Sequence, residues 1–286
     1  MRAHELMFET PQPRDVFRSQ IKTWQDLEQA LPRIQTAIER FQKGFLIYRG
    51  LKYTADSVLF KPEMPKGTRS SANTSNYYTL FTDNNVRWKD YPPRSASVIG
   101  SNNYSIAENY GHPYVLLPEG DPIIGIASEN DFWFSFPRLY DIGLDSLDEL
   151  NYEISNIMKY WLDKPKYRPT SWQEFKKDLQ QIDQINYLSF PNLPKKESEL
   201  YITRNHLLKF QPGTTMEEKL DYLLDPQANG IELTRLSSFK YEKRSSHEVW
   251  FNSPCWLIQY DLMQDNLSNS FNLVSWIKQK AAQEQR

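Results

Sequence analysis

The sequence contains one cysteine and four histidines among its 286 residues. Cys255 therefore has no partner for an intrachain disulfide, and the dispersed histidines give none of the ligand spacings of a structural zinc site. No run approaches the roughly eighteen apolar residues of a membrane span, and residues 1–17 lack the apolar core of a secretory signal. We therefore expect no metal, no membrane partner and a soluble, cytoplasmic protein.

Neither sign of charge dominates, because the formal net charge is −2. This balance argues against a protein that holds nucleic acid through its overall field. Three short basic clusters leave a nucleic-acid partner open, but their pattern favours ordinary solvated surface; they lie at 164–168, 194–196 and 240–244. Aromatic residues make up 14% of the chain and glycines number only 10, a composition that argues against disorder.

Apolar residues recur at three- and four-residue steps between residues 22 and 44. This spacing predicts a helix that bends or starts again at Pro32 and ends at Gly44. Shorter apolar runs predict strands elsewhere, with a hairpin at 113–127, and two further helices follow from their periodicity. The other expected strands are 45–50, 94–101, 230–242 and the pair within 244–261, and the further helices are 103–111 and 270–286.

The region between the two groups of strands has the start signals of helices. A hydroxyl residue stands three positions before a glutamate at Ser146, Ser171 and Thr215, and this spacing is typical of the capping box. The order helix, strands, helices, strands, helix predicts an α+β fold. We expect one domain over 1–286, with an N-terminal helical segment at 1–44 and a helical insertion at about 140–225.

Three of the expected strands have a polar residue at their edge. Arg49 closes "IYRG", Ser95 and Ser97 lie in "RSAS", and Glu248 opens "EVWF". In a strand, Ser95 and Ser97 would face one side because they alternate with Ala96. A buried Arg49 would need an anionic partner, either a protein carboxylate or a ligand phosphate.

Taken in order, these segments resemble the Arg, Ser and Glu motifs of the Arg-Ser-Glu class of mono-ADP-ribosyltransferases, which includes phage- and toxin-like members. The segments are "IYRG", "SASVIGSNNYSIAENYG" and "SHEVWFNSPCWLI", and the resemblance covers about 45–135 and 230–262. It implies an ADP-ribosyltransferase-like split β-sheet core and NAD as the substrate. The helical block and the termini lie outside the resemblance.

The resemblance also implies roles for individual residues. It makes Glu248, Arg49 and Ser95 the catalytic candidates, with Ser95 or Ser97 orienting the glutamate. Phe239 is a candidate because an aromatic residue often precedes the glutamate strand in that family, and Tyr110 is a second stacking candidate beside Trp250. The residues expected to bind NAD are Arg49, Gly50, Ser95, Ser97, Tyr110 and Phe239.

The chemistry of NAD cleavage gives these residue types a physical reason. Breaking the nicotinamide–ribose bond produces an oxocarbenium-like sugar, which a fixed carboxylate beside the ribose stabilises. The pyrophosphate needs a cation or backbone amides. Each residue also has a structural interpretation: Glu248 as a solvated strand end, Arg49 as half of an ion pair, the aromatic residues as core, and Asp131 as a turn cap.

Three functions remain open on the sequence. We expect a mono-ADP-ribosyltransferase that transfers ADP-ribose to an unknown acceptor. The alternatives are a NAD glycohydrolase, in which water is the acceptor, and a catalytically silent domain of the same fold that serves binding or assembly. Ser246 stands where the family usually has Glu or Gln two positions before the catalytic glutamate, so the sequence does not indicate the acceptor.

Overall fold

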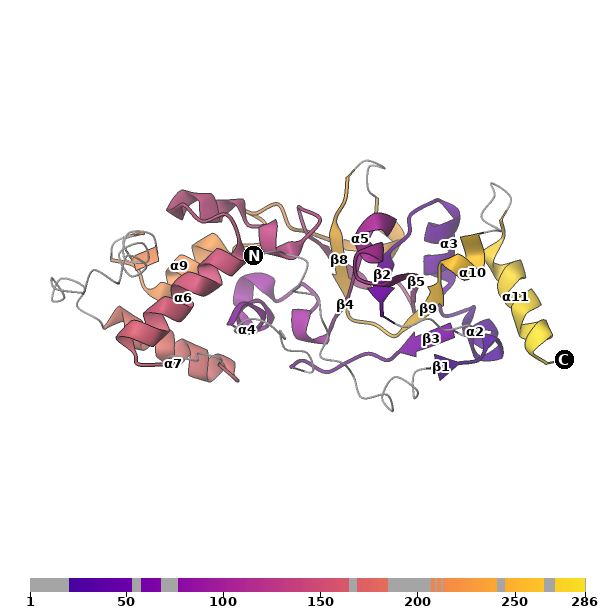
Figure 1. Cartoon of the computed structure of the whole chain (residues 1–286), viewed down its shortest axis with the longest axis horizontal. Coiled ribbons are helices and arrows are strands. Elements are labelled where there is room, and N and C mark those ends of the chain that lie inside the picture. Colours follow the sequence, from indigo (N-terminus) through magenta and orange to yellow (C-terminus); the bar gives the residue numbers. More distant parts are fainter. Residues whose placement is uncertain are drawn as a thin grey trace. The chain divides into compact units, whose positions relative to one another are not determined.

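The computed structural model describes residues 21–52, 58–67, 77–164, 169–184, 207–208, 210–211, 213–240, 245–264 and 271–285. These residues form two compact units, each labelled by element in Figure 1. The first takes its residues from Met1–Ala72, Tyr91–Asn130 and Glu232–Arg286, and the second from Asn73–Asp90 and Asp131–Ile231. The insertion expected at about 140–225 falls within the second unit, which also includes residues 73–90.

The first unit is built on an antiparallel sheet of nine strands in the order β1-β3-β9-β5-β2-β4-β8-β6-β7. Helices and an antiparallel sheet together make an α+β fold, as predicted. No helix among the described residues has both the length and the apolar character needed to cross a membrane. The strands are β1 (Ile21–Lys22), β2 (Tyr48–Leu51), β3 (Val58–Lys61), β4 (Val98–Ser101), β5 (His112–Pro118), β6 (Ile123–Ile126), β7 (Glu232–Arg235), β8 (Glu248–Phe251) and β9 (Cys255–Gln259).

The sheet is weakly joined at its middle, between β2 and β4. Only Tyr48 and Ser101 are paired there, whereas four residue pairs join β2 to β5 and four join β4 to β8. Because the register between β2 and β4 is this one residue pair, the nine-stranded sheet can be divided there into a five-stranded part from β1 to β2 and a four-stranded part from β4 to β7.

Two short connections cross between these parts, and they correct one prediction. The segment 113–127 was expected to be a hairpin, but β5 pairs with β2 and β9 while β6 pairs with β7 and β8. β8 and β9 are likewise consecutive in the sequence but lie in different parts of the sheet. Prolines bend both chains at the crossing, where the Glu119 amide donates to the Pro254 carbonyl over 2.8 Å. The sequence pattern identified the strands but not their partners.

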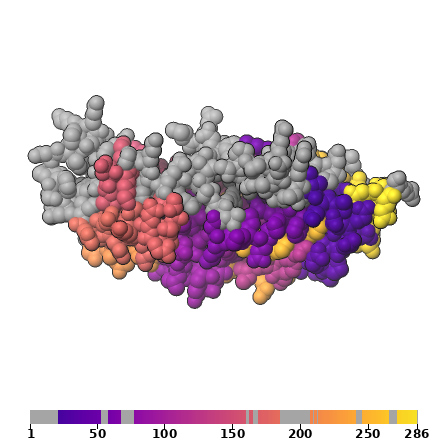
Figure 2. All heavy atoms as spheres, turned by 90° about the horizontal axis from the view of Figure 1, so that it is seen from below, coloured from indigo at the N-terminus to yellow at the C-terminus, as the bar shows by residue number. Residues whose placement is uncertain are grey.

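The helices of the first unit follow the sequence closely. The expected break at Pro32 separates α2 (Trp24–Ala30) from α3 (Gln35–Gln42), and Gly44 follows α3 with a φ of 81°. The C-terminal helix α11 (Leu273–Glu284) packs beside α2, where the rings of Trp24 and Trp276 meet edge to face at 5.1 Å. Figure 2 shows this meeting of the two ends of the described chain, in indigo and yellow. The short helices α5 (Tyr104–Glu108) and α10 (Asp261–Gln264) complete the unit.

The second unit is helical, and its caps were correctly predicted. Ser146, Ser171 and Thr215 each accept a hydrogen bond from the amide of the glutamate three residues later, at 3.2–3.3 Å. Rings of buried aromatic residues fill the space between the helices, such as Phe132 and Phe136 at 5.0 Å. The helices are α4 (Tyr77–Asn84), α6 (Leu147–Trp161), α7 (Trp172–Asp183) and α9 (Met216–Leu223).

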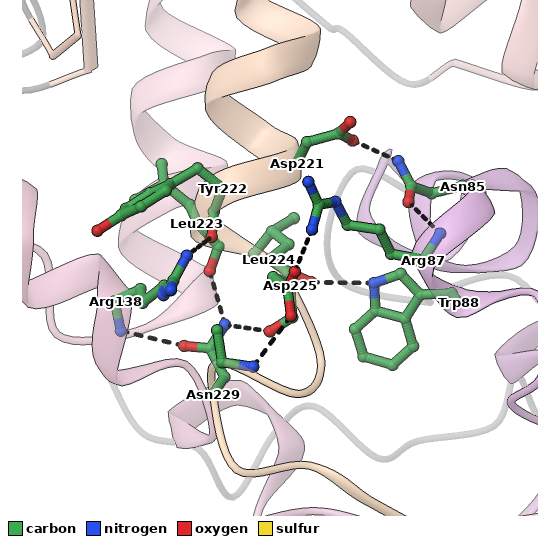
Figure 3. A network of polar contacts seen from close by, with 11 residues as sticks. Asn85, Arg87, Trp88, Arg138, Asp221, Tyr222, Leu223, Leu224, Asp225 and Asn229 are labelled. Carbon is green, nitrogen blue, oxygen red and sulfur yellow. Dashed lines mark hydrogen bonds and ion pairs between the residues drawn. The ribbon is translucent and has the colours of Figure 1, made fainter.

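A polar network in the second unit explains why residues 73–90 belong to it (Figure 3). Asn85 donates to Asp221, and the Arg87 guanidinium pairs with Asp225. The indole of Trp88 is buried and donates to the Leu224 carbonyl at 2.9 Å. The Leu224 carbonyl at the end of α9 and the carboxylates of Asp221 and Asp225 thereby find their partners in a segment more than 130 residues earlier in the sequence.

Thr215 offers a direct test of the helix starts. Its hydroxyl accepts from the Glu218 amide, and the Glu218 carboxylate accepts from the Thr215 amide at 2.7 Å. Thr215→Ala removes the cap, and we expect the free energy of unfolding of the second unit to fall by about 1 kcal/mol. Urea unfolding followed by circular dichroism measures the loss. Thr215→Ser keeps the hydroxyl and should behave like the wild-type protein; an equal loss in both variants would contradict the capping role.

Candidate functional site

Glu248 is the first residue of β8, as predicted, and its side chain is buried. Its backbone is held from the β6 side, where its amide donates to the Glu129 carbonyl at 3.1 Å and its carbonyl accepts from the Ala127 amide at 2.9 Å. The carboxylate accepts a hydrogen bond from the Arg94 guanidinium at 2.6 Å. A buried carboxylate that accepts from a guanidinium is fixed in place, unlike a carboxylate at a solvated strand end.

Arg94 is a residue of this candidate site that the sequence analysis missed. Its side chain is 7% exposed and that of Glu248 is 3% exposed, so water screens this ion pair little. The guanidinium also lies over the Trp250 ring, 4.8 Å from its centroid. The segment before Arg94 holds the same indole, because Tyr91 stacks on it and the Pro92 carbonyl accepts its N–H at 3.0 Å.

Ser95 and Ser97 do not lie on a strand, contrary to the prediction. Residues Arg94–Ala96 form a 3₁₀ helix after two prolines, and β4 begins only at Val98. The Ser95 hydroxyl accepts from the Gly67 amide at 2.6 Å, and the Ser97 hydroxyl donates to the Pro93 carbonyl at 2.8 Å. Because Ser97 uses its proton on Pro93, it is not the donor that orients Glu248. Both serines stabilise the turn that carries Arg94.

Arg49 lies on β2 at the point where β2 and β4 separate. Its guanidinium donates to the Ile99 carbonyl of β4 at 2.6 Å and so fills the gap beside the single Tyr48–Ser101 pair. Successive side chains of a strand point to opposite faces of the sheet, so the Arg49 side chain starts on the face opposite to that of Tyr48. Its guanidinium turns toward β4, where it meets the Ile99 carbonyl. A cation in such a gap is a suitable partner for an anionic ligand group.

A small pocket, with a cavity volume of about 30 Å³, lies at the same strands. Three residues predicted to bind NAD line it, namely Arg49, Gly50 and Tyr110. Its other lining residues come from β2, β4 and α5, and they include Ser101. The pocket is named the α5 pocket below, and its lining residues are Tyr48, Arg49, Gly50, Ile99, Gly100, Ser101, Ile106, Ala107 and Tyr110.

The α5 pocket and Glu248 lie on neighbouring strands. Ser101 lines the pocket and is the registered partner of both Tyr48 on β2 and Glu248 on β8. Adjacent strands lie about 4.8 Å apart, so β2 and β8 are separated by roughly 10 Å. Arg49 and Glu248, 199 positions apart in the sequence, are thus carried by strands on either side of β4. Their side chains start from opposite faces of the sheet, because Glu248 shares the face of Ser101 and Tyr48 whereas Arg49 follows Tyr48.

Gly50 is required for the close contact between β2 and α5. A Cβ atom at this position would lie 2.0 Å from the Ala107 carbonyl oxygen and 2.8 Å from Cβ of Tyr110. Both neighbours are fixed parts of the pocket wall, so any larger side chain would push α5 away from the sheet. The "RG" pair of the first motif therefore has a structural reason at its second position.

The aromatic candidates separate into one pocket residue and two core residues. Tyr110 lines the α5 pocket. Phe239 is 1% exposed within the hydrophobic core of the first unit, and Trp250 is fully buried. Neither ring offers a face to a ligand, because other side chains cover it. Asp131 caps a 3₁₀ helix by accepting from the Trp133 amide at 2.9 Å, as expected for a turn residue.

Cys255, the single cysteine, has no place in this site. Its side chain is completely buried, and burial raises the pKa of its thiol far above the ordinary value. A thiolate nucleophile is therefore excluded at neutral pH.

Comparison with family models, with curated proteins and with solved structures finds no match to this chain. The site offers a fixed, buried carboxylate and, on the next strand but one, a guanidinium beside a pocket. A carboxylate of this kind can stabilise a developing positive charge, and a guanidinium can hold an anionic group.

Proposed function

We propose that the chain is a NAD-dependent mono-ADP-ribosyltransferase that cleaves the nicotinamide–ribose bond and transfers ADP-ribose to an acceptor. The α5 pocket carries this proposal. Arg49, Gly50 and Tyr110 were each expected to bind NAD, and they line one pocket whose Ser101 pairs with Glu248. The chemistry requires an anion-binding cation and a fixed carboxylate that both reach one substrate.

The proposed reaction assigns a task to each group. The bond between the ribose carbon and the nicotinamide nitrogen breaks, its electron pair goes to the ring, and neutral nicotinamide leaves. Positive charge then develops on the ribose, where the Glu248 carboxylate stabilises it. Arg49 holds the pyrophosphate, and Arg94 holds Glu248 in one orientation. A nucleophile of the acceptor forms the new bond to the ribose carbon and loses its proton.

The architecture of the first unit also supports the proposal. A split sheet with its two parts joined at one residue pair agrees with the ADP-ribosyltransferase-like core that the motifs imply. The Glu motif was expected to open a strand and to continue through a proline turn into a second strand. β8 begins at Glu248, and β9 follows the Pro254 turn.

One observation favours a second candidate, a catalytically silent domain of the same fold. The Glu248 carboxylate is already paired with Arg94 inside the protein. A carboxylate that serves only to neutralise a buried guanidinium is a structural element and needs no substrate. In that case the α5 pocket would bind its ligand without breaking a bond.

Incubation with NAD separates these functions. The purified chain should release nicotinamide from NAD that carries a label in its adenine ring. Label attached to macromolecules of an added cell lysate indicates a transferase, whereas free labelled ADP-ribose alone indicates a NAD glycohydrolase. Nicotinamide release no faster than in buffer, under conditions where the protein is folded, would leave the silent domain as the function.

Arg49 should affect binding of NAD more than the chemical step. Arg49→Gln removes the guanidinium at the α5 pocket, and hydrogen bonds to charged groups contribute about 1.5–3 kcal/mol. We expect KM for NAD to rise about tenfold or more, with kcat changed less. Arg33→Gln is the matched control, because Arg33 is an exposed arginine of the same unit that pairs with Glu119. A KM unchanged in Arg49→Gln would contradict the assignment of Arg49.

A further inference from the structure

The segment that leads into Glu248 is held in part by the side chain of Asn102, the residue that follows β4. The Asn102 Oδ1 atom accepts from the His247 amide at 2.7 Å, and its Nδ2 atom donates to the Ser245 carbonyl at 3.1 Å. The Asn102 amide also donates to the His247 carbonyl at 3.2 Å. The side-chain oxygen thus takes the place of a backbone carbonyl and extends the β4–β8 pairing past Glu248.

The contacts of Asn102 can be made only by a carboxamide. The residue is 6% exposed, and its side chain accepts from one backbone group and donates to another two residues away. An aspartate carboxylate at this position could accept a hydrogen bond from the His247 amide. Its second oxygen could not donate to the Ser245 carbonyl, so two acceptors would face one another. An alanine would leave both backbone groups without their partners.

The neighbours of Asn102 connect the same segment to the α5 pocket. The Ser101 hydroxyl donates to the His247 carbonyl at 3.2 Å and accepts from the Asn103 amide at 3.1 Å. Asn103 in turn caps α5 by accepting from the Ser105 amide at 2.9 Å. Three consecutive residues therefore hold the pocket wall on one side and the approach to Glu248 on the other.

We propose that Asn102 is a positioning residue that fixes Glu248 relative to the α5 pocket, an inference that rests on the proposed function. β8 begins at Glu248 itself, so regular strand geometry fixes the chain after this residue but not before it. Asn102 supplies part of that constraint from the β4 side, together with the Ser101 hydroxyl, while the His247 ring contacts the Ala127 carbonyl. It acts through the backbone of 245–247 and touches no reacting atom.

Asn102→Asp tests this role with almost no change in size. We expect kcat for nicotinamide release to fall about tenfold to a hundredfold, because a displacement of about 1 Å at a reacting group can cost a hundredfold in rate. KM for NAD should change less than about threefold, since Arg49 and the pocket wall are untouched. Amide hydrogen exchange should speed up in peptides that cover 245–248 and remain slow in β9.

Asn84→Asp is the matched control, because Asn84 is exposed on α4 of the second unit and bonds only within its own helix. It should leave kcat, KM and exchange unchanged. Faster exchange at 245–248 with a wild-type kcat would overturn the positioning role while leaving the proposed function intact. Unchanged exchange in Asn102→Asp would overturn it as well. Absence of nicotinamide release from the wild-type protein is a separate result that removes the proposed function, and the inference with it.

Discussion

Glu248→Gln should lower the rate of nicotinamide release at least about a hundredfold. The substitution keeps the shape of the side chain and an oxygen that can accept from Arg94, but it removes the negative charge. Loss of one preorganised electrostatic contact to a developing charge typically costs about 3 kcal/mol of transition-state stabilisation. Nicotinamide release at saturating NAD, measured by chromatography, gives the rate directly.

The matched control for this change is Glu232→Gln. Glu232 also opens a strand of the first unit, β7, but its side chain is exposed. It should retain the wild-type rate. If Glu248→Gln releases nicotinamide within a few-fold of the wild-type rate while its circular dichroism is unchanged, Glu248 is not the catalytic carboxylate.

The largest loss of stability should come from Arg94→Met. Methionine keeps much of the apolar contact with Trp250 but leaves the Glu248 carboxylate buried without its cation. Removing one partner of a buried ion pair typically costs about 3–5 kcal/mol. We expect that decrease in the free energy of unfolding of the first unit, measured by urea titration at neutral pH.

Two further variants show whether the loss comes from the buried charge. Arg33→Met breaks an ion pair whose arginine is 56% exposed, and exposed pairs contribute only about 0–1 kcal/mol. Combining Arg94→Met with Glu248→Gln should recover part of the stability, because no unpaired charge remains. Stability losses of Arg94→Met and Glu248→Gln that simply add in the double variant would contradict the coupling of these residues.

Local signals in the sequence were sufficient to predict most helices and most strands, but not α10, β1 or β3. The helix boundaries follow from features within four residues, such as the hydroxyl of Thr215 and the proline between α2 and α3. Strand partners depend on contacts far apart in the chain. The apolar runs at 113–118 and 123–126 therefore indicated two strands correctly, while their assignment to one hairpin was wrong.

The residues of the candidate site were likewise found where the signal is local and missed where it depends on contacts far apart in the chain. Glu248 at the start of a strand, and Arg49 and Gly50 on another, were found from their local pattern. Arg94 stands 154 positions before its partner, and the sequence around it gives no sign of that ion pair. Ser95 and Ser97 were misplaced because "RSAS" alternates like a strand, whereas the two preceding prolines favour a turn. Phe239 was expected to bind NAD, but it lies in the hydrophobic core of the first unit. An aromatic residue near a motif has the same sequence pattern whether it packs in the core or contacts a ligand.

The central claim is that Arg49 and Glu248 act on one NAD molecule, and a crystal structure of Glu248→Gln with bound NAD tests it most directly. The slowed variant should retain the intact substrate for long enough to be observed. The account predicts the pyrophosphate at the Arg49 guanidinium in the α5 pocket and the nicotinamide-bearing ribose beside the side chain at position 248. NAD bound away from either residue, or a pocket that binds no NAD at millimolar concentration, would contradict it.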